Sequence, residues 1–310
     1  MAPTRARSPD ALLECVPNVS EGRDQALIRA LGDAVERAGV ELRDVHSDVD
    51  HHRSVFTYLG APDAVERATL ALARLAVERV DLRRHKGVHP RVGAVDVVPF
   101  IPLRGTLMKE AVQSARRFGR AFSDATGVPV FFYAEASADP NRRELPIMRW
   151  GGFEGLAERL RDPTWCPDCG GAEPHPRAGV TIVGARGPLI AFNAMLDTPD
   201  VTIAKSIAAA VRESAPGGLP AVRALGVPLE SRGIAQVAMN LLDYQRTSPA
   251  VVAARVEREA RARGTDVSRW ELVGCAPADA FADWIAAART LDVAPSQLLD
   301  AELFTRAGVR

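Results

Sequence analysis

The sequence has no excess of either charge and very little lysine. Its 310 residues carry 39 basic and 39 acidic side chains, so the formal net charge is zero. A neutral chain lacks the cationic excess that phosphate backbones attract, which argues against nucleic-acid binding. Only Lys86, Lys109 and Lys205 are lysines, and arginine makes up the rest of the basic residues. Each remaining lysine therefore marks a position where a compact ammonium group could be needed.

Long apolar runs and a cysteine framework are also missing. No run approaches the roughly 18 apolar residues that cross a bilayer. The first ten residues hold two arginines without an apolar stretch behind them, so we expect neither a membrane span nor a secretory leader. The four cysteines, Cys15, Cys166, Cys169 and Cys275, are too few for a disulfide scaffold. These features favour a globular chain in the reducing cytoplasm.

Alternating apolar patterns predict the same order of elements in both halves of the chain. The first half reads as strands at 12–19, 40–45, 54–59 and 94–100 with helices at 23–38 and 62–80, extended by a helix at 107–125 and a strand at 128–133. The second half reads as strands at 189–196, 222–227, 234–242 and 267–273, with helices at 198–212 and 248–264. Thr198 and Ser248 are the expected N-caps. Two βαββαβ units predict an α+β fold with an internal duplication of the ferredoxin-like motif.

An irregular segment at 161–179, rich in proline and glycine, separates the two halves. It is too long for an idle connection, so it is either a linker or a loop held against a ligand. We place the first subdomain at residues 1–179 and the second at residues 180–310.

Five of the six histidines fall in two short loops: His46, His51, His52, His85 and His89. The spacing of His85 and His89 would suit a metal site on a helix, but Gly87 and Pro90 disfavour a helix there. Hydrated loop histidines remain one alternative, and a catalytic or ligand-binding role in the basic run 83–91 is the other. A histidine among cations has a lowered pKa and stays neutral as a base, and the same cations attract an anionic substrate.

The pair Cys166 and Cys169 forms a C-x-x-C motif. No helix signal follows it and no second C-x-x-C exists, so neither a thioredoxin-like site nor a zinc ribbon is indicated. The two thiols together with His175 could hold a metal, but we expect incidental thiols.

Several long motifs resemble those of the glutamate formimidoyltransferase family. They are ECVPNVSEG at 14–22, HRSVFT at 52–57, KGVHPRVGAVD at 86–96, PFIP at 99–102, VGAR at 183–186, AFN at 191–193 and QVAMNLLD at 236–243. Trp165, Pro167, Asp168 and Gly170 match the family's W-x-P-D-x-G. The resemblance covers roughly residues 12–285.

The resemblance implies two ferredoxin-like subdomains facing each other across a cleft, and a homodimer. It implies transfer of a formimino group from N-formimidoyl-L-glutamate to tetrahydrofolate as co-substrate, with no metal. His89 falls on the family's catalytic histidine. The folate-binding segment falls on Gly170, Gly171, Ala172, Glu173, Pro174, His175, Pro176, Arg177, Ala178 and Gly179. The remaining expected substrate-binding residues are Asn18, Arg53, Lys86 and Arg91, whose three cations suit polyanionic substrates.

The chain also departs from the family pattern. His46 stands where the family often has aspartate, and the interior of 170–179 is not closely matched. We expect the single-activity form, without the cyclodeaminase domain. Two rival hypotheses are a folate-binding protein that has lost the reaction and a metal-dependent formimino hydrolase.

Overall fold

The computed structural model describes residues 10–287 and 293–304. Its first sheet has seven strands: β1 Leu13–Cys15, β2 Asn18–Val19, β3 Glu41–Asp48, β4 Arg53–Gly60, β5 Val95–Pro102, β6 Val130–Ala134 and β7 Thr181–Ala185. β1 and β2 both pair antiparallel with β4 and β5, so they act as one strand that is interrupted at Val16 and Pro17. β3 pairs with β4, and β7 lies parallel between β5 and β6.

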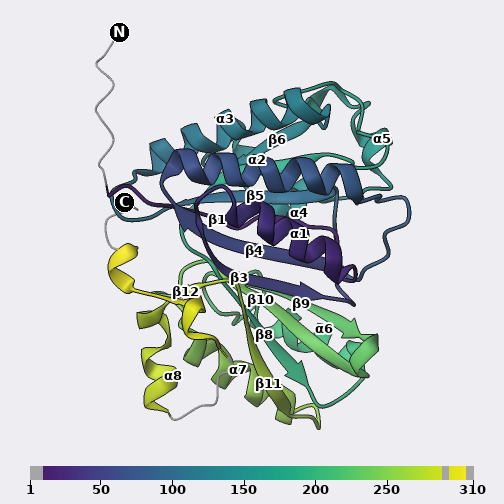
Figure 1. Cartoon of the computed structure of the whole chain (residues 1–310). Coiled ribbons are helices and arrows are strands. Elements are labelled where there is room, and N and C mark those ends of the chain that lie inside the picture. The colour runs from purple at the N-terminus through teal and green to yellow at the C-terminus, as the bar shows by residue number, and fades with distance from the viewer. Residues whose placement is uncertain (1–9, 288–292, 305–310) are drawn as a thin grey trace.

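Three helices cover one face of this sheet: α1 Gln25–Glu36, α2 Pro62–Arg79 and α3 Met108–Thr126 (Figure 1). Asp24 caps α1 by accepting hydrogen bonds from the backbone of Ala26 and Leu27. Burial of one apolar side of each helix against the sheet forms the first core, which includes Phe100, Phe118 and Phe122.

The second sheet has the strand order β11-β8-β10-β9 and is antiparallel throughout. Its strands are β8 Ile190–Leu196, β9 Val222–Leu229, β10 Ile234–Leu241 and β11 Val267–Val273, with helices α6 Val201–Val211 and α7 Pro249–Arg261. Phe192, Val237 and Leu272 point toward these helices into the second core. The second sheet lies beside the first (Figure 1), and because side chains alternate along a strand, the neighbouring residues in each strand point away from α6 and α7. Short elements complete the fold: α4 Leu145–Met148, α5 Leu156–Arg159, α8 Ala282–Ala286 and the parallel pair β12 Ala276–Pro277 with β13 Leu298–Leu299.

The predicted duplication is confirmed, because each half contributes a βαββαβ unit with ferredoxin-like strand order. One predicted cap is wrong. Asp200, not Thr198, caps α6, because the Asp200 carboxylate accepts a hydrogen bond from the backbone N–H of Thr202. Thr198 lies two residues before this cap.

The first sheet extends beyond residue 179, where we expected the first subdomain to end. β7 follows that boundary, yet it pairs with β5 and β6 of the first sheet. We therefore propose that the chain divides between β7 and β8, at residues 186–189. Within the described ranges, no helix is both long and apolar enough to span a bilayer.

Candidate active site

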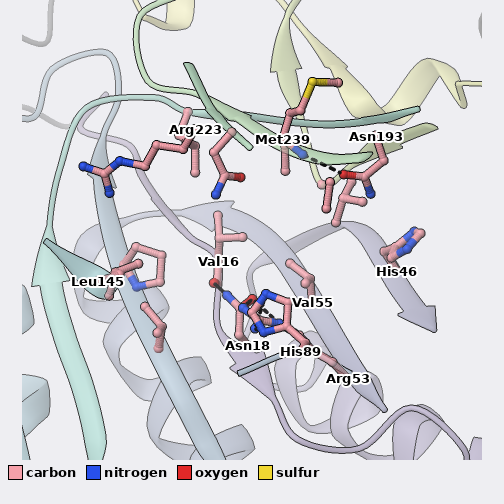
Figure 2. Close-up of a pocket in the computed structure, with 18 of the residues that line it drawn as sticks. Val16, Asn18, His46, Arg53, Val55, His89, Leu145, Asn193, Arg223 and Met239 are labelled. Carbon is pink, nitrogen blue, oxygen red and sulfur yellow. Dashed lines mark hydrogen bonds between the residues drawn. The ribbon is translucent and has the colours of Figure 1, made fainter. Parts of the chain in front are cut away.

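A cavity of about 520 Å³ lies between the facing surfaces of the two sheets (Figure 2). Val16 and Val55 form an apolar wall on the first sheet, and Ala238 and Leu225, which are paired across β10 and β9, form one on the second. Polar side chains lie around these walls. They are Glu14, Asn18, His46, Asp48, His51, Arg53, His89, Tyr133, Arg149, Arg186, Asn193, Arg223, Gln236, Asn240 and Glu271.

His89 reaches the cavity from the loop between α2 and β5. Two glycines allow this loop to pack tightly. A Cβ on Gly87 would lie 2.3 Å from the carbonyl oxygen of His51, and one on Gly93 would lie 2.1 Å from the carbonyl oxygen of Val180. The backbone N–H of Val88 donates to the carbonyl of Asp50 at 3.0 Å, which ties the loop to the end of β3. The loop conformation is therefore fixed by backbone contacts that a side chain would block.

His89 is surrounded by positive charge. Arg53 Nη1 lies 2.6 Å from its Nδ1, and the His51 ring centroid lies 5.7 Å from its own. Burial, followed by the charges of Arg53 and Arg149, holds the pKa of His89 well below its usual range. The carbonyl of Pro90, 2.8 Å from Nδ1, accepts the proton of that nitrogen. Because a guanidinium group can only donate, Arg53 Nη1, which is also 3.2 Å from Nε2, requires that Nε2 carries no proton. His89 is thus a neutral base near pH 7.

A buried carboxylate organises these cations. Asp96 is 1% exposed and accepts from Arg149 Nη2 at 2.5 Å, with Arg53 Nη1 at 3.7 Å. It also accepts from the backbone N–H of Val92 at 2.8 Å, at the end of the His89 loop. Arg53 Nε in turn donates to Asn18 Oδ1 at 2.8 Å. One carboxylate therefore positions two guanidinium groups in the wall beside His89.

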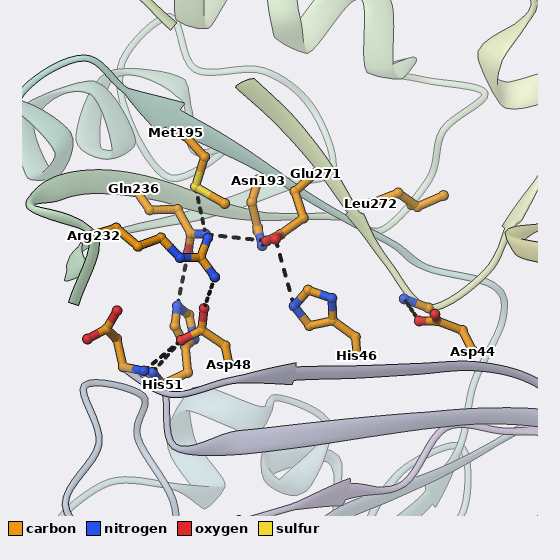
Figure 3. Close-up of polar contacts among 12 residues, drawn as sticks. Asp44, His46, Asp48, His51, Asn193, Met195, Arg232, Gln236, Glu271 and Leu272 are labelled. Atoms are coloured by element: carbon orange, nitrogen blue, oxygen red, sulfur yellow. Dashed lines mark hydrogen bonds and ion pairs between the residues drawn. The ribbon is translucent and has the colours of Figure 1, made fainter. Parts of the chain in front are cut away.

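The second sheet meets this region with amide and carboxylate side chains (Figure 3). Gln236 Oε1 lies 3.0 Å from His51 Nε2, across the interface between the sheets. Glu271 accepts from Asn193 Nδ2 at 3.0 Å, and its other oxygen lies 3.9 Å from His46 Nε2. Burial lowers the pKa of His51, so this imidazole is also neutral near pH 7.

Another part of the cavity holds Glu14 and two further arginines, Arg186 and Arg223. Burial raises the pKa of Glu14 to about 7, and the charge of Arg186 opposes this increase. Arg223 forms an ion pair with Glu144. With Arg53 and Arg149, four guanidinium groups of the described residues line the cavity.

Comparison with protein families identifies the chain. A model of the formiminotransferase domain, N-terminal subdomain, matches residues 12–186, and a model of the formiminotransferase domain matches residues 191–291. The chain belongs to the formiminotransferase family. The two matches meet between β7 and β8, where the strand pairing also divides the chain.

Curated relatives of this formiminotransferase chain include enzymes of one and of two named activities. The chain is 41% identical to a glutamate formimidoyltransferase of Streptococcus pyogenes serotype M1, over 88% of this chain and 91% of the relative. It is 38% identical to one of Thermoplasma acidophilum, over 88% and 90%. It is 41% identical to a formimidoyltransferase-cyclodeaminase of Rattus norvegicus, over 88% of this chain but 51% of the relative. The chain thus spans about half the length of the two-activity relatives.

The formiminotransferase structure brings three of the expected site residues into the cavity: Asn18, Arg53 and His89. Lys86 and Arg91 do not line it. Lys86 is exposed, and its carbonyl accepts from Arg23 at 3.0 Å. Arg91 donates to both oxygens of Glu154, at 2.9 and 2.7 Å, and its Nε donates to His85 Nδ1 at 3.0 Å. The cations that act on His89 are therefore Arg53 and Arg149, and not the neighbouring basic run as we expected.

None of residues 170–179 lines the cavity either. This segment runs beside the chain that leads into β5. The carbonyls of Arg177 and Ala178 accept from the backbone of Leu82 and Ala94, both at 2.9 Å. His175 Nδ1 accepts from the backbone of Ala178 at 3.0 Å, which stabilises a turn. The assignment of this segment to folate stays a prediction.

The C-x-x-C segment is anchored by Asp168, the residue that precedes Cys169. Asp168 accepts from the backbone of Phe132 at 2.7 Å and pairs with Arg142 at 3.1 Å, which ties the segment to β6. Cys166 is exposed, and burial raises the pKa of the half-buried Cys169 thiol. Over the described part of the chain, no three His, Cys, Asp or Glu side chains come together in a group that could hold a metal ion.

Sequence reasoning missed the site roles of Arg149, Asn193, Gln236 and Glu271. Asn193 and Gln236 stand within motifs shared with the family, which was a usable signal. Glu271 carries no such signal, because the same strand also holds the charged Arg269. No local pattern distinguishes Arg149 from other arginines of an irregular segment.

Proposed function

We propose that this chain is a glutamate formimidoyltransferase, moving the formimino group from N-formimidoyl-L-glutamate to N5 of tetrahydrofolate in histidine degradation. Two relatives of this name are matched over about nine-tenths of their length. The observation that carries the proposal is His89, a neutral imidazole within a cavity lined by arginines. We further propose a cytoplasmic homodimer that needs no metal.

The reaction forms a bond between N5 and the formimino carbon and breaks the bond from that carbon to the glutamate nitrogen. His89 accepts the proton that N5 loses and then donates a proton to the departing glutamate nitrogen. Its low pKa keeps it ready for the first transfer. One imidazole between the two nitrogens serves both steps, and no covalent enzyme intermediate is needed.

The cavity contributes by holding two substrates in contact, which can lower the barrier by several kcal/mol. Both substrates carry carboxylates, and Arg53, Arg149, Arg186 and Arg223 supply guanidinium groups to bind them. Asn18 holds Arg53 in place. We retain residues 170–179, Lys86 and Arg91 as proposed contacts for parts of the substrates that extend beyond the cavity.

The deciding experiment measures glutamate release from N-formimidoyl-L-glutamate by the purified protein, with and without tetrahydrofolate. We expect release only when tetrahydrofolate is present, and the same rate after treatment with a chelator. Release without folate that a chelator abolishes would instead support a metal-dependent hydrolase. Folate binding without any release would support a binding protein.

A further inference from the structure

Three acidic side chains of the described residues line the cavity, and two of them already have cationic partners. Asp48 pairs with Arg232 at 2.8 Å and accepts from the backbone of His51 at 2.8 Å. Glu14 interacts with the charge of Arg186. Glu271 is the third, and no described arginine or lysine forms an ion pair with it.

The position of Glu271 is fixed by the second sheet. Glu271 on β11 lies directly opposite Asn193 on β8, so both side chains point to the cavity (Figure 3). Its Oε2 accepts from Asn193 Nδ2 at 3.0 Å, and Gln236 Nε2 lies 3.5 Å away. Its Oε1 lies 3.9 Å from His46 Nε2, which is beyond hydrogen-bond distance.

A nearly buried carboxylate with one oxygen unengaged is costly unless a ligand completes its contacts. Glu271 is 9% exposed, and one oxygen receives no hydrogen bond within the described ranges. A planar ligand edge with two adjacent N–H donors is the natural complement of such a group. The 2-amino group and the N3–H of a reduced pterin form an edge of this kind.

We propose that Glu271 binds the 2-amino–N3–H edge of the pterin ring of tetrahydrofolate and so orients N5 toward His89. This inference rests on the proposed function and deepens it. It places the pterin inside the cavity, whereas the segment 170–179 lies outside. The apolar walls support it, because the cavity offers a ring contacts with Val16 and Val55 on the first sheet (Figure 2) and with the cross-strand pair Ala238 and Leu225 on the second.

The formimino group also has paired N–H donors, but its position does not fit Glu271. Its carbon must lie within reach of His89, whereas the contacts of the described residues connect Glu271 to His89 through two intervening side chains, Gln236 and His51. In the pterin, N5 belongs to one ring and the amino edge to the other, so the two groups can meet different sides of the cavity.

The test is a binding cycle that needs no turnover. Dissociation constants are measured anaerobically for tetrahydrofolate and its 2-deamino analogue, with the wild-type protein and with Glu271→Gln. We expect Glu271→Gln to weaken tetrahydrofolate binding at least about tenfold, since a charge-assisted hydrogen bond is lost. The 2-deamino analogue should bind the wild type more weakly by a similar factor and should hardly distinguish wild type from variant. The matched control is Glu230→Gln, an exposed carboxylate of the same subdomain outside the cavity.

The outcomes separate the possibilities. Equal binding of both ligands by the wild type would overturn the inference without any variant, so the test does not depend on the folding of Glu271→Gln. Weaker binding of N-formimidoyl-L-glutamate alone in the variant would assign Glu271 to the formimino group and also overturn it. If the wild-type protein neither bound tetrahydrofolate nor transferred the formimino group, the proposed function itself would be refuted.

Discussion

The carboxylate of Asp96 offers a sharp test of how the site is held together. The substitution Asp96→Asn keeps the side-chain shape and an acceptor for the backbone of Val92, but it removes the charge that pairs with Arg53 and Arg149. The new amide N–H group would face guanidinium donors. Removing one partner of a buried ion pair typically costs about 3–5 kcal/mol, because the other charge stays buried and unpaired.

That cost is a large share of the 5–15 kcal/mol by which folded domains are usually stable. We therefore expect Asp96→Asn to lower the melting temperature by several degrees. The assay is calorimetry or circular dichroism at neutral pH. Asp81→Asn is the control, because Asp81 pairs with the exposed Arg83 and its loss should leave the melting temperature nearly unchanged.

A second substitution tests the reason for the loss. Arg149→Met in the Asp96→Asn background removes one of the two stranded guanidinium groups, so it should restore part of the lost stability. If Asp96→Asn melted at the wild-type temperature, or if the double variant were less stable than the single one, the carboxylate would not be what balances these charges.

Three further predictions concern catalysis. His89→Ala should lower kcat by roughly 100-fold or more while both substrates still bind, because a general acid–base group is lost; more than about a tenth of the wild-type rate would refute this role. Arg53→Met should raise the pKa of His89, since a nearby positive charge disappears, and so move the acidic limb of the kcat/KM profile to higher pH. Lys86→Met is its control, and an equal movement in both variants would contradict the geometry. Replacing Cys166 and Cys169 together by serine should leave activity near normal, with no stoichiometric zinc by metal analysis of the wild type; loss of both activity and bound metal would revive the hydrolase hypothesis.

The fold was predictable where the sequence of an element itself determines its structure and its ends. Helix α2 begins at Pro62 and ends at Arg79, close to the expected 62–80, because its apolar period and its first residue are both encoded in the segment itself. The strand β7 was not predicted. Five residues after an irregular loop carry no sign of which sheet they join, and pairing with β5 depends on contacts far along the chain.

The residues of the cavity show the same difference between what the local sequence predicts and what depends on distant parts of the chain. The place of His89 in the cavity was predictable, because a long motif surrounds it. The charges around it were not, since Lys86 and Arg91 are its neighbours in sequence while Arg53 and Arg149 act on it in space. Closeness in sequence along a loop does not predict where a long side chain points. Neither Lys86 nor Arg91 lines the cavity.

The alternation of side chains along the strands has an evolutionary consequence. Along β8, Ala191 and Asn193 face the cavity while Phe192 between them fills the core. Glu14 and Cys15 alternate in the same way on β1. Substrate recognition and stability are therefore encoded by interleaved residues on one scaffold. Mutations at every second position can retune which molecules the cavity accepts while the packing that keeps the chain folded stays intact, so new specificities are within reach of single substitutions.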